Sequence, residues 1–192
     1  MHKTCLLLLI FFFCFACKQK KNQSEIAQPI KDTTAFFPVN DLLLADINDV
    51  KQTPYFIYKI TTKKKSRDSV SLSKEEFLSL ANLFLQKKIS TPELKPLYKE
   101  SSFHDLSTSS YTIVYTATDT SLPVKEVTIL LDDATNKLKH VFIRNVISNN
   151  DSTLIEQYDW KASKSFRINR YIKRKDNSET KETNFINWND PQ

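Results

Sequence analysis

The chain has 192 residues, a net charge of +6 and no glycine. Average glycine usage of about 7% would supply roughly 13 glycines to a chain of this length. Phosphate-binding loops, dinucleotide-binding turns and the nucleophile elbow of hydrolases all depend on glycine, so their usual forms are excluded. Turns must use Asn, Asp and Ser, which tolerate left-handed backbone angles better than most residues.

The N-terminus has the pattern of a secretory signal. Lys3 is followed by an almost unbroken apolar run from Cys5 to Ala16, which ends at Lys18. The run is too short to cross a bilayer, because a membrane-spanning helix needs roughly 20 apolar residues. A charged start before an apolar stretch of this length is typical of a signal peptide that is removed after export.

Residues 14–17, Cys-Phe-Ala-Cys, resemble the lipobox of bacterial lipoproteins, although that family prefers Leu and then a small residue at the first two positions. The resemblance implies that residues 1–16 are the signal peptide and that Cys17 carries the acyl chains, palmitate among them. Each buried methylene of such chains contributes about 0.8 kcal/mol to membrane binding. Lys18 is not the Asp that retains many lipoproteins in the inner membrane. The resemblance to small Gram-negative lipoproteins therefore implies an outer-membrane protein that faces the periplasm.

Composition divides the rest of the chain in two. Residues 17–35 are polar, contain Pro29 and have no apolar period, which predicts a flexible tether after the lipidated cysteine. As a random coil this tether reaches roughly 20 to 25 Å. Residues 36–190 suit a single globular domain. All three cysteines precede this domain, so a disulfide framework is excluded there.

Two helices and one hairpin are predicted in the first half of the domain. Apolar residues at three- and four-residue spacing predict a helix from Val39 to Val50, which ends before Pro54. Tyr55 to Thr61 is a predicted strand and Arg67 to Leu72 a short return strand. Ser73 and Glu76 form a predicted capping box. The helix that follows has one apolar face, made of Phe77, Leu80, Ala81, Phe84 and Leu85.

The second half of the domain changes to a period of two, which predicts strands. Short polar connections between them favour antiparallel hairpins, because parallel pairing needs a crossover of a dozen or more residues. The stretch from Pro92 to Leu106 is predicted to be an irregular connector. We therefore expect an α+β domain, with one or two N-terminal helices on an antiparallel meander of about six or seven strands. The predicted strands of this half are Tyr111 to Thr118, Val124 to Leu131, Lys137 to Ile147, Thr153 to Trp160, Phe166 to Lys173 and Thr180 to Trp188.

The connector contains the densest group of catalytic residue types in the domain. Ser101, Ser102, His104 and Asp105 lie together there with Glu100. A nucleophile needs a base that a third group holds in a defined geometry, and adjacency in sequence does not supply this. We expect a turn stabilised by these side chains and assign no catalytic residue.

Metal and cofactor sites are not expected. Only His104 and His140 follow Cys17, whereas zinc needs three or four nitrogen or sulfur ligands. Asp132, Asp133 and Asn136 lack the central glycine of a calcium loop, so we interpret them as a hairpin turn.

Two groups of residues are candidates for ligand binding. A run of basic residues is predicted either to present a positive strip to anionic lipid or an acidic envelope protein, or to protect an exposed edge strand. Phe77, Phe84 and Trp160 are candidates for an apolar pocket between sheet and helix. Tyr158, Trp188, Phe142 and Phe185 either line such a cavity or belong to the core. The basic residues are Lys164, Arg167, Arg170, Lys173, Arg174 and Lys175.

These features favour a non-catalytic, membrane-anchored lipoprotein of the cell envelope, whose domain binds or scaffolds another envelope component. The alternative is a periplasmic carrier or chaperone for an apolar ligand, and an enzyme is the third possibility. Export makes a nucleic-acid partner unsuitable despite the basic run.

Overall fold

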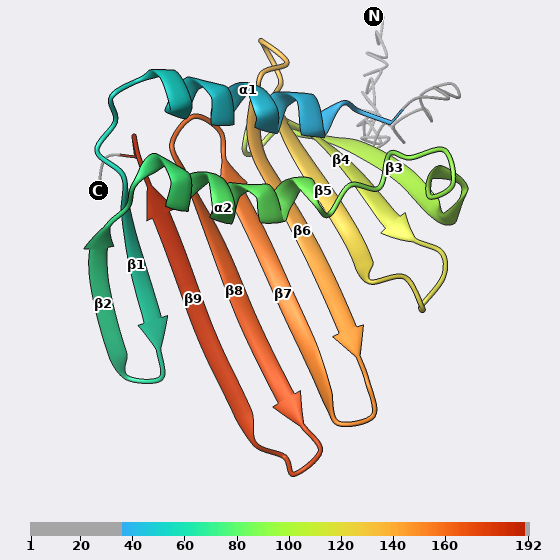
Figure 1. The fold of residues 1–192 in the computed structure, drawn as a ribbon. Coiled ribbons are helices and arrows are strands. Elements are labelled where there is room, and N and C mark those ends of the chain that lie inside the picture. The colour runs from blue at the N-terminus through green and yellow to red at the C-terminus, as the bar shows by residue number, and fades with distance from the viewer. Residues whose placement is uncertain (1–35, 191–192) are drawn as a thin grey trace, which may run out of the picture.

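A single antiparallel sheet organises residues 36–190, the part of the chain that this computed structural model describes. The strands lie in the order β2-β1-β9-β8-β7-β6-β5-β4-β3, so a meander from β3 to β9 is extended by the first hairpin (Figure 1). The predicted signal peptide, Cys17 and the tether lie outside the described residues. The strands are β1 (Tyr58–Lys63), β2 (Ser66–Ser71), β3 (Tyr98–Asp105), β4 (Ser110–Ala117), β5 (Val124–Asp132), β6 (Leu138–Ser148), β7 (Ser152–Lys161), β8 (Ser165–Arg174) and β9 (Glu179–Asn187).

The expected number of strands, six or seven, was too low. Part of the predicted connector is β3, which pairs with β4 from Tyr98 to Asp105. Its sequence hid it because β3 is an edge strand with most side chains exposed, so it lacks the apolar alternation of the inner strands. In addition, both strands of the first hairpin join the same sheet through the pairing of β1 with β9. The class α+β and the antiparallel meander are confirmed.

Both predicted helices are present and lie on the same face of the sheet (Figure 1). α1 (Val39–Gln52) precedes the sheet, whereas α2 (Lys74–Leu85) lies between β2 and β3 and is therefore not N-terminal to all strands. The capping box is confirmed, because Glu76 N donates to Ser73 Oγ at 3.2 Å and Ser73 N donates to Glu76 Oε2 at 2.8 Å. Neither helix is both long and apolar enough to cross a membrane.

An aromatic cluster forms the centre of the core between α2 and the sheet. Phe84 packs edge-to-face against Tyr158, Trp160 and Phe166 with ring centroids 5.0 to 5.2 Å apart. Phe77 makes a similar contact with Trp188 at 5.3 Å. Edge-to-face pairs at these distances are favoured by the ring quadrupoles.

One carboxylate of α1 is hydrogen-bonded to the sheet and to one of its turns. Asp46 Oδ2 accepts a hydrogen bond from the Trp160 indole nitrogen at 2.9 Å and another from Ser163 N at 2.7 Å. Its Oδ1 accepts a third from Ser163 Oγ at 3.0 Å. Asp46 therefore links α1 both to the aromatic cluster and to the turn between β7 and β8.

Turns of this glycine-free chain use other residues at positive φ. These positions lie in the connections between strands, as expected for sharp hairpins. Asn136, with φ of 55°, belongs to a turn in which Asp132 Oδ1 accepts from the nitrogen and the hydroxyl of Thr135, so the hairpin turn predicted there is confirmed. Asn and Ser were expected in this role and Lys was not. The five residues are Lys64, Ser109, Asn136, Ser163 and Asn177.

Lys64→Gly should stabilise the domain. Lys64 has φ of 55° in the two-residue loop between β1 and β2, and a side chain with Cβ is disfavoured in that region whereas glycine is not. We expect a gain of about 0.5 to 1 kcal/mol in the free energy of unfolding, measured by urea denaturation. Lys65→Gly is the matched control, because Lys65 is not at positive φ and glycine there only loosens the unfolded chain. Equal effects of the two substitutions would contradict this account.

Candidate functional site

The two faces of the sheet differ in what covers them. Strand alternation directs Phe166 and Ile168 of β8, and Ile186 of β9, toward the helices, where all three are buried. The intervening residues, such as Arg167 and Phe185, point to the other face, which neither α1 nor α2 covers. We call this second face the open face.

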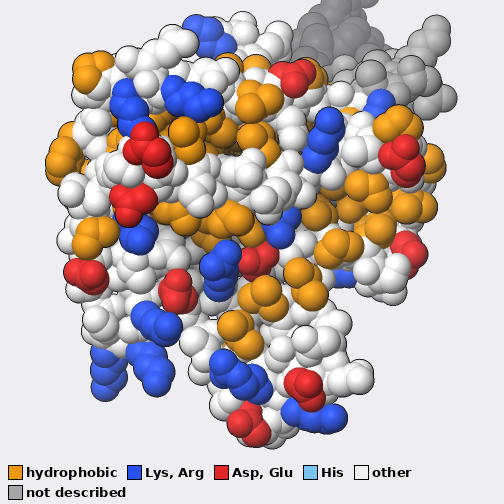
Figure 2. All heavy atoms as spheres, viewed as in Figure 1, with side chains coloured by type: hydrophobic (Ala, Val, Ile, Leu, Met, Phe, Trp, Pro, Cys, Tyr) orange, Lys and Arg blue, Asp and Glu red, His pale blue; other side chains and the backbone are white. Residues whose placement is uncertain are grey.

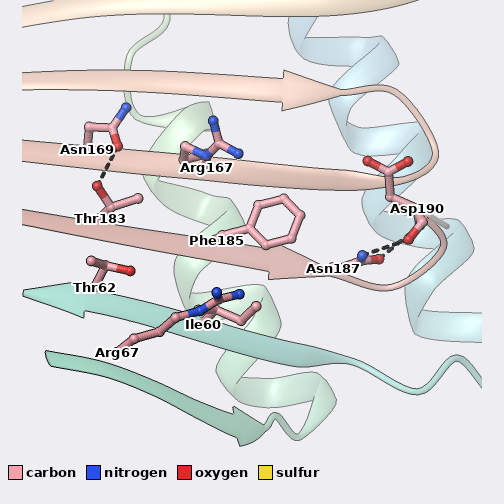
Figure 3. Close-up of a pocket in the computed structure, with 9 residues that line it drawn as sticks. All are labelled: Ile60, Thr62, Arg67, Arg167, Asn169, Thr183, Phe185, Asn187 and Asp190. Carbon is pink, nitrogen blue, oxygen red and sulfur yellow. Dashed lines mark hydrogen bonds between the residues drawn. The ribbon is translucent and has the colours of Figure 1, made fainter. Parts of the chain in front are cut away.

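The open face contains a groove over β2, β1, β9 and β8 (Figure 3). The main hollow has a volume of about 720 Å³, which lies in the range of small-molecule sites. A second hollow of about 410 Å³ extends toward β7 and shares Asn169 and Thr183 with the first. We call the two together the open-face groove. The main hollow is lined by Ile60, Thr62, Arg67, Arg167, Asn169, Thr183, Phe185, Asn187 and Asp190.

Two arginines from strands far apart in sequence line the main hollow. The Arg167 guanidinium lies 5.4 Å from the centroid of the Phe185 ring, and Arg67 reaches from β2 across β1 (Figure 3). Arg167 is paired in register with Asp159, but that carboxylate lies 3.3 Å from His140 Nδ1. Among residues 36–190, no carboxylate lies within 4 Å of either guanidinium. Both arginines therefore have donors available for a ligand.

The carboxylate that lines the main hollow is already paired. Asp190 accepts from Lys161 Nζ at 2.8 and 2.9 Å and from Ser165 Oγ at 3.2 Å. The hydrogen bond with Lys161 lowers the pKa of Asp190 and keeps it ionised. Asn187 lies beside it and accepts from Asp190 N at 2.8 Å. The charges that remain unpaired in this hollow are therefore positive.

The residues of the predicted basic strip lie on both faces of the sheet. The prediction of a single basic surface was therefore wrong. Arg167 and Lys173 point to the open face, whereas Arg170 points to the helix-bearing face and donates to Glu156 at 3.0 Å. Lys164 and Lys175 lie in the turns at opposite ends of β8, and Arg174 at the end of this strand donates to Thr180 Oγ1. β8 lies between β7 and β9, so it is not an edge strand either.

The side chains that were predicted to line an apolar pocket fill the space between the sheet and α2 themselves. Phe77, Phe84 and Trp160 are each at most 1% exposed and belong to the aromatic cluster. Tyr158 and Trp188 are also core, which confirms that alternative for them. A ligand between sheet and α2 would have to displace these rings. Phe142 and Phe185 point instead to the open face.

The serine, histidine and acidic residues that were predicted to lie in a connector belong to β3, and their side chains alternate between its two faces. His104 Nε2 lies 3.3 Å from Asp133 Oδ2, and Ser102 Oγ accepts from Tyr111 at 2.9 Å. Asp105 instead accepts from Ser107 and Thr108 in the next turn. Ser102 and His104 therefore each have a partner from outside the predicted group.

A buried carboxylate joins the end of α2 to the helix-bearing face. Glu156 accepts from Lys87 at 3.2 Å, from Asn145 at 3.0 Å and from Arg170 at 3.0 Å. Burial alone would raise the pKa of Glu156, but the hydrogen bond with Tyr158 and the two cations outweigh burial, so the pKa lies below its ordinary value. We interpret this network as structural because its members satisfy one another.

Charged side chains are scattered over the helix-bearing face (Figure 2). In Figure 2 a group of Lys and Arg side chains marks the tip of the β1–β2 hairpin, which includes Lys63, Lys64 and Lys65. Lys63 pairs with Glu182 at 3.4 Å, and both side chains are at least partly exposed. Such exposed pairs contribute little to stability.

Comparisons with known proteins find no match. No family model, no curated protein and no solved structure matches this chain.

Glu156→Gln should destabilise the domain in a pH-dependent way. At pH 7 the loss should be about 2 to 3 kcal/mol, since the substitution removes charge-assisted hydrogen bonds from a buried site. Because the folded-state pKa of Glu156 is lowered, its contribution is fully present above the ordinary pKa of about 4.5 and is lost as the pH falls through the folded-state pKa. Urea denaturation of both proteins from pH 7 to pH 3 measures the difference.

Glu126→Gln is the control, since Glu126 is exposed on β5 and, within residues 36–190, accepts a hydrogen bond only from Thr128, at 3.3 Å. It should change the free energy of unfolding by less than about 0.5 kcal/mol. A loss at Glu156 that did not shrink at low pH would contradict the assigned charge network.

Proposed function

We propose that this protein is a non-catalytic binding lipoprotein of the bacterial cell envelope, whose domain holds an envelope component on its open face. In this proposal, acyl chains on Cys17 anchor the mature protein to the outer membrane, and residues 18–35 separate the domain from the lipid headgroups. The support for the anchor is the sequence pattern around Cys17.

The observation that carries the binding role is the open-face groove. One face of the sheet is filled by the aromatic cluster and α2, whereas the other presents a hollow of about 720 Å³ with unpaired guanidinium groups. Its other lining groups are two amides, two hydroxyls, the apolar side chains of Ile60 and Phe185, and the Asp190 carboxylate, which Lys161 neutralises. The amides, hydroxyls and apolar side chains orient a ligand through hydrogen bonds and apolar contact. A few polar groups converging on a partly apolar hollow are typical of a binding site.

Cys17→Ser should release the protein from the membrane fraction. Without the thiol no acyl chain can be attached, so the affinity of about 0.8 kcal/mol per buried methylene is lost. Wild-type protein should incorporate radiolabelled palmitate and sediment with membranes, and the variant should do neither. Cys5→Ser is the matched control, because Cys5 lies outside residues 14–17, and it should leave both unchanged. Equal fractionation of wild type and Cys17→Ser would overturn the proposed anchor.

A photocrosslinking amino acid at Thr62 should capture the envelope component in intact cells. Thr62 lines the main hollow, whereas Ala45 is exposed on α1 and provides the control on the helix-bearing side. We expect a specific adduct from position 62 and none from position 45, with mass spectrometry to identify the adduct. Adducts of equal yield from both positions would contradict the open face as the binding surface.

A further inference from the structure

We propose that the open-face groove binds an acidic oligosaccharide, a chain of sugar rings that carries carboxylate or phosphate groups. This inference rests on the proposed role of the open face as the binding surface, and it adds the chemical class of the ligand. Three features of the groove support this assignment. They are a polar row across five strands, apolar side chains beside that row, and unpaired cations at its borders.

The polar row follows from the register of the strands. Arg67 of β2 is opposite Thr62 of β1, which is opposite Thr183 of β9. Thr183 is opposite Asn169 of β8, which is opposite Gln157 of β7. The row therefore places a guanidinium, two hydroxyls and two amides in an unbroken line on one face. Within it Thr183 Oγ1 donates to Asn169 Oδ1 at 2.8 Å, which leaves the Asn169 NH2 group to donate to a ligand. Four strand spacings give it a length of about 19 Å, so it suits an extended ligand.

Apolar side chains lie on both sides of the polar row. On one side Ile60 is opposite Phe185, and the Arg167 guanidinium lies over the Phe185 ring in a cation–π contact. On the other side Ile155 is opposite Tyr171. Sugar rings combine hydroxyl edges with C–H faces, so they can hydrogen-bond to the row while their faces pack on these side chains.

The charges of the groove select for an anion. Arg67 and Arg167 line the main hollow and Lys181 lines the second hollow, and among the described residues none of the three makes an ion pair. Asp190, the carboxylate of the main hollow, is neutralised by Lys161. Stacking on Phe185 orients the guanidinium of Arg167, and a guanidinium matches the two oxygens of a carboxylate or phosphate.

The sheet itself argues against an extended acidic peptide as the ligand. A peptide that adds to a sheet uses free backbone groups at an edge strand. The groove lies over the faces of β1, β9 and β8, whose backbone groups already pair with one another. An anionic bilayer fits less well, because its charged groups are spread over a plane, whereas the polar groups of the groove lie along one row across the strands.

Isothermal titration calorimetry on the full chain in a non-ionic detergent tests the proposal. Trigalacturonate carries the carboxylate, and maltotriose 6-phosphate carries the phosphate. Neutral maltotriose and inorganic phosphate are the reference ligands. We expect at least one anionic oligosaccharide to bind at least tenfold more tightly than both references. The reason is that its charge-assisted hydrogen bonds and the packing of its sugar rings on the apolar side chains act together.

Arg67→Gln and Arg167→Gln should each weaken that binding at least tenfold, because each removes a charged, forked donor. Arg174→Gln is the matched control, since it removes the same charge from the end of β8, lines neither hollow and donates to Thr180 instead. It should change the dissociation constant less than twofold. Circular dichroism of all three variants should match the wild type, as these side chains are at least partly exposed.

Three results would overturn the inference. They are the absence of binding of both anionic oligosaccharides at millimolar concentration, equally tight binding of inorganic phosphate, and equal weakening by Arg174→Gln. The calorimetry does not depend on Cys17 or on the cell. A crosslink from Thr62 in cells together with any of these results would therefore leave the proposed function standing and remove only the saccharide assignment.

Discussion

The edge-to-face packing of Phe84 against Tyr158, Trp160 and Phe166 determines which face of the sheet is buried. These partners come from β7 and β8, the middle of the predicted meander, and burial of each such ring contributes roughly 1.5 to 3 kcal/mol. Because side chains alternate along a strand, a shift of one residue in register would send the core side chains to the opposite face. The composition of the open face follows from this packing, since Arg167 and Asn169 are the residues that alternate with the buried ones.

The position of the first hairpin completes the groove. β1 pairs with β9 although more than a hundred residues separate them in sequence, and this pairing sets Ile60 beside Phe185 and brings Arg67 to the same surface. Thr61 and Asn184 reinforce the pairing through a hydrogen bond of 2.8 Å. The edge of the meander is thereby covered by a hairpin, which pairs the backbone groups that β9 would otherwise leave free.

Local patterns in the sequence predict most of the elements but not the site. The capping box at Ser73 and the period of two in β4 to β9 are short-range signals, so α2 and these strands were predicted within a few residues. β3 was missed because an exposed edge strand needs no apolar alternation. The groove was missed because its polar row joins five strands, and no local pattern shows that Arg67 and Gln157 lie on one line. Among the groove residues, three were singled out beforehand, which are Phe185 and the two arginines Arg167 and Arg170. The arginines were assigned to one basic strip, but strand alternation places their side chains on opposite faces.

The most direct measurement of the central claim is a map of backbone amide chemical shifts of the full chain as trigalacturonate and maltotriose 6-phosphate are added. The account predicts that the largest changes under at least one ligand cluster around Thr62, Asn169, Thr183 and Phe185, and that α2 and the amides next to Trp160 change little. Changes that centred on α2 and the aromatic cluster would instead place the ligand on the helix-bearing side and contradict the account.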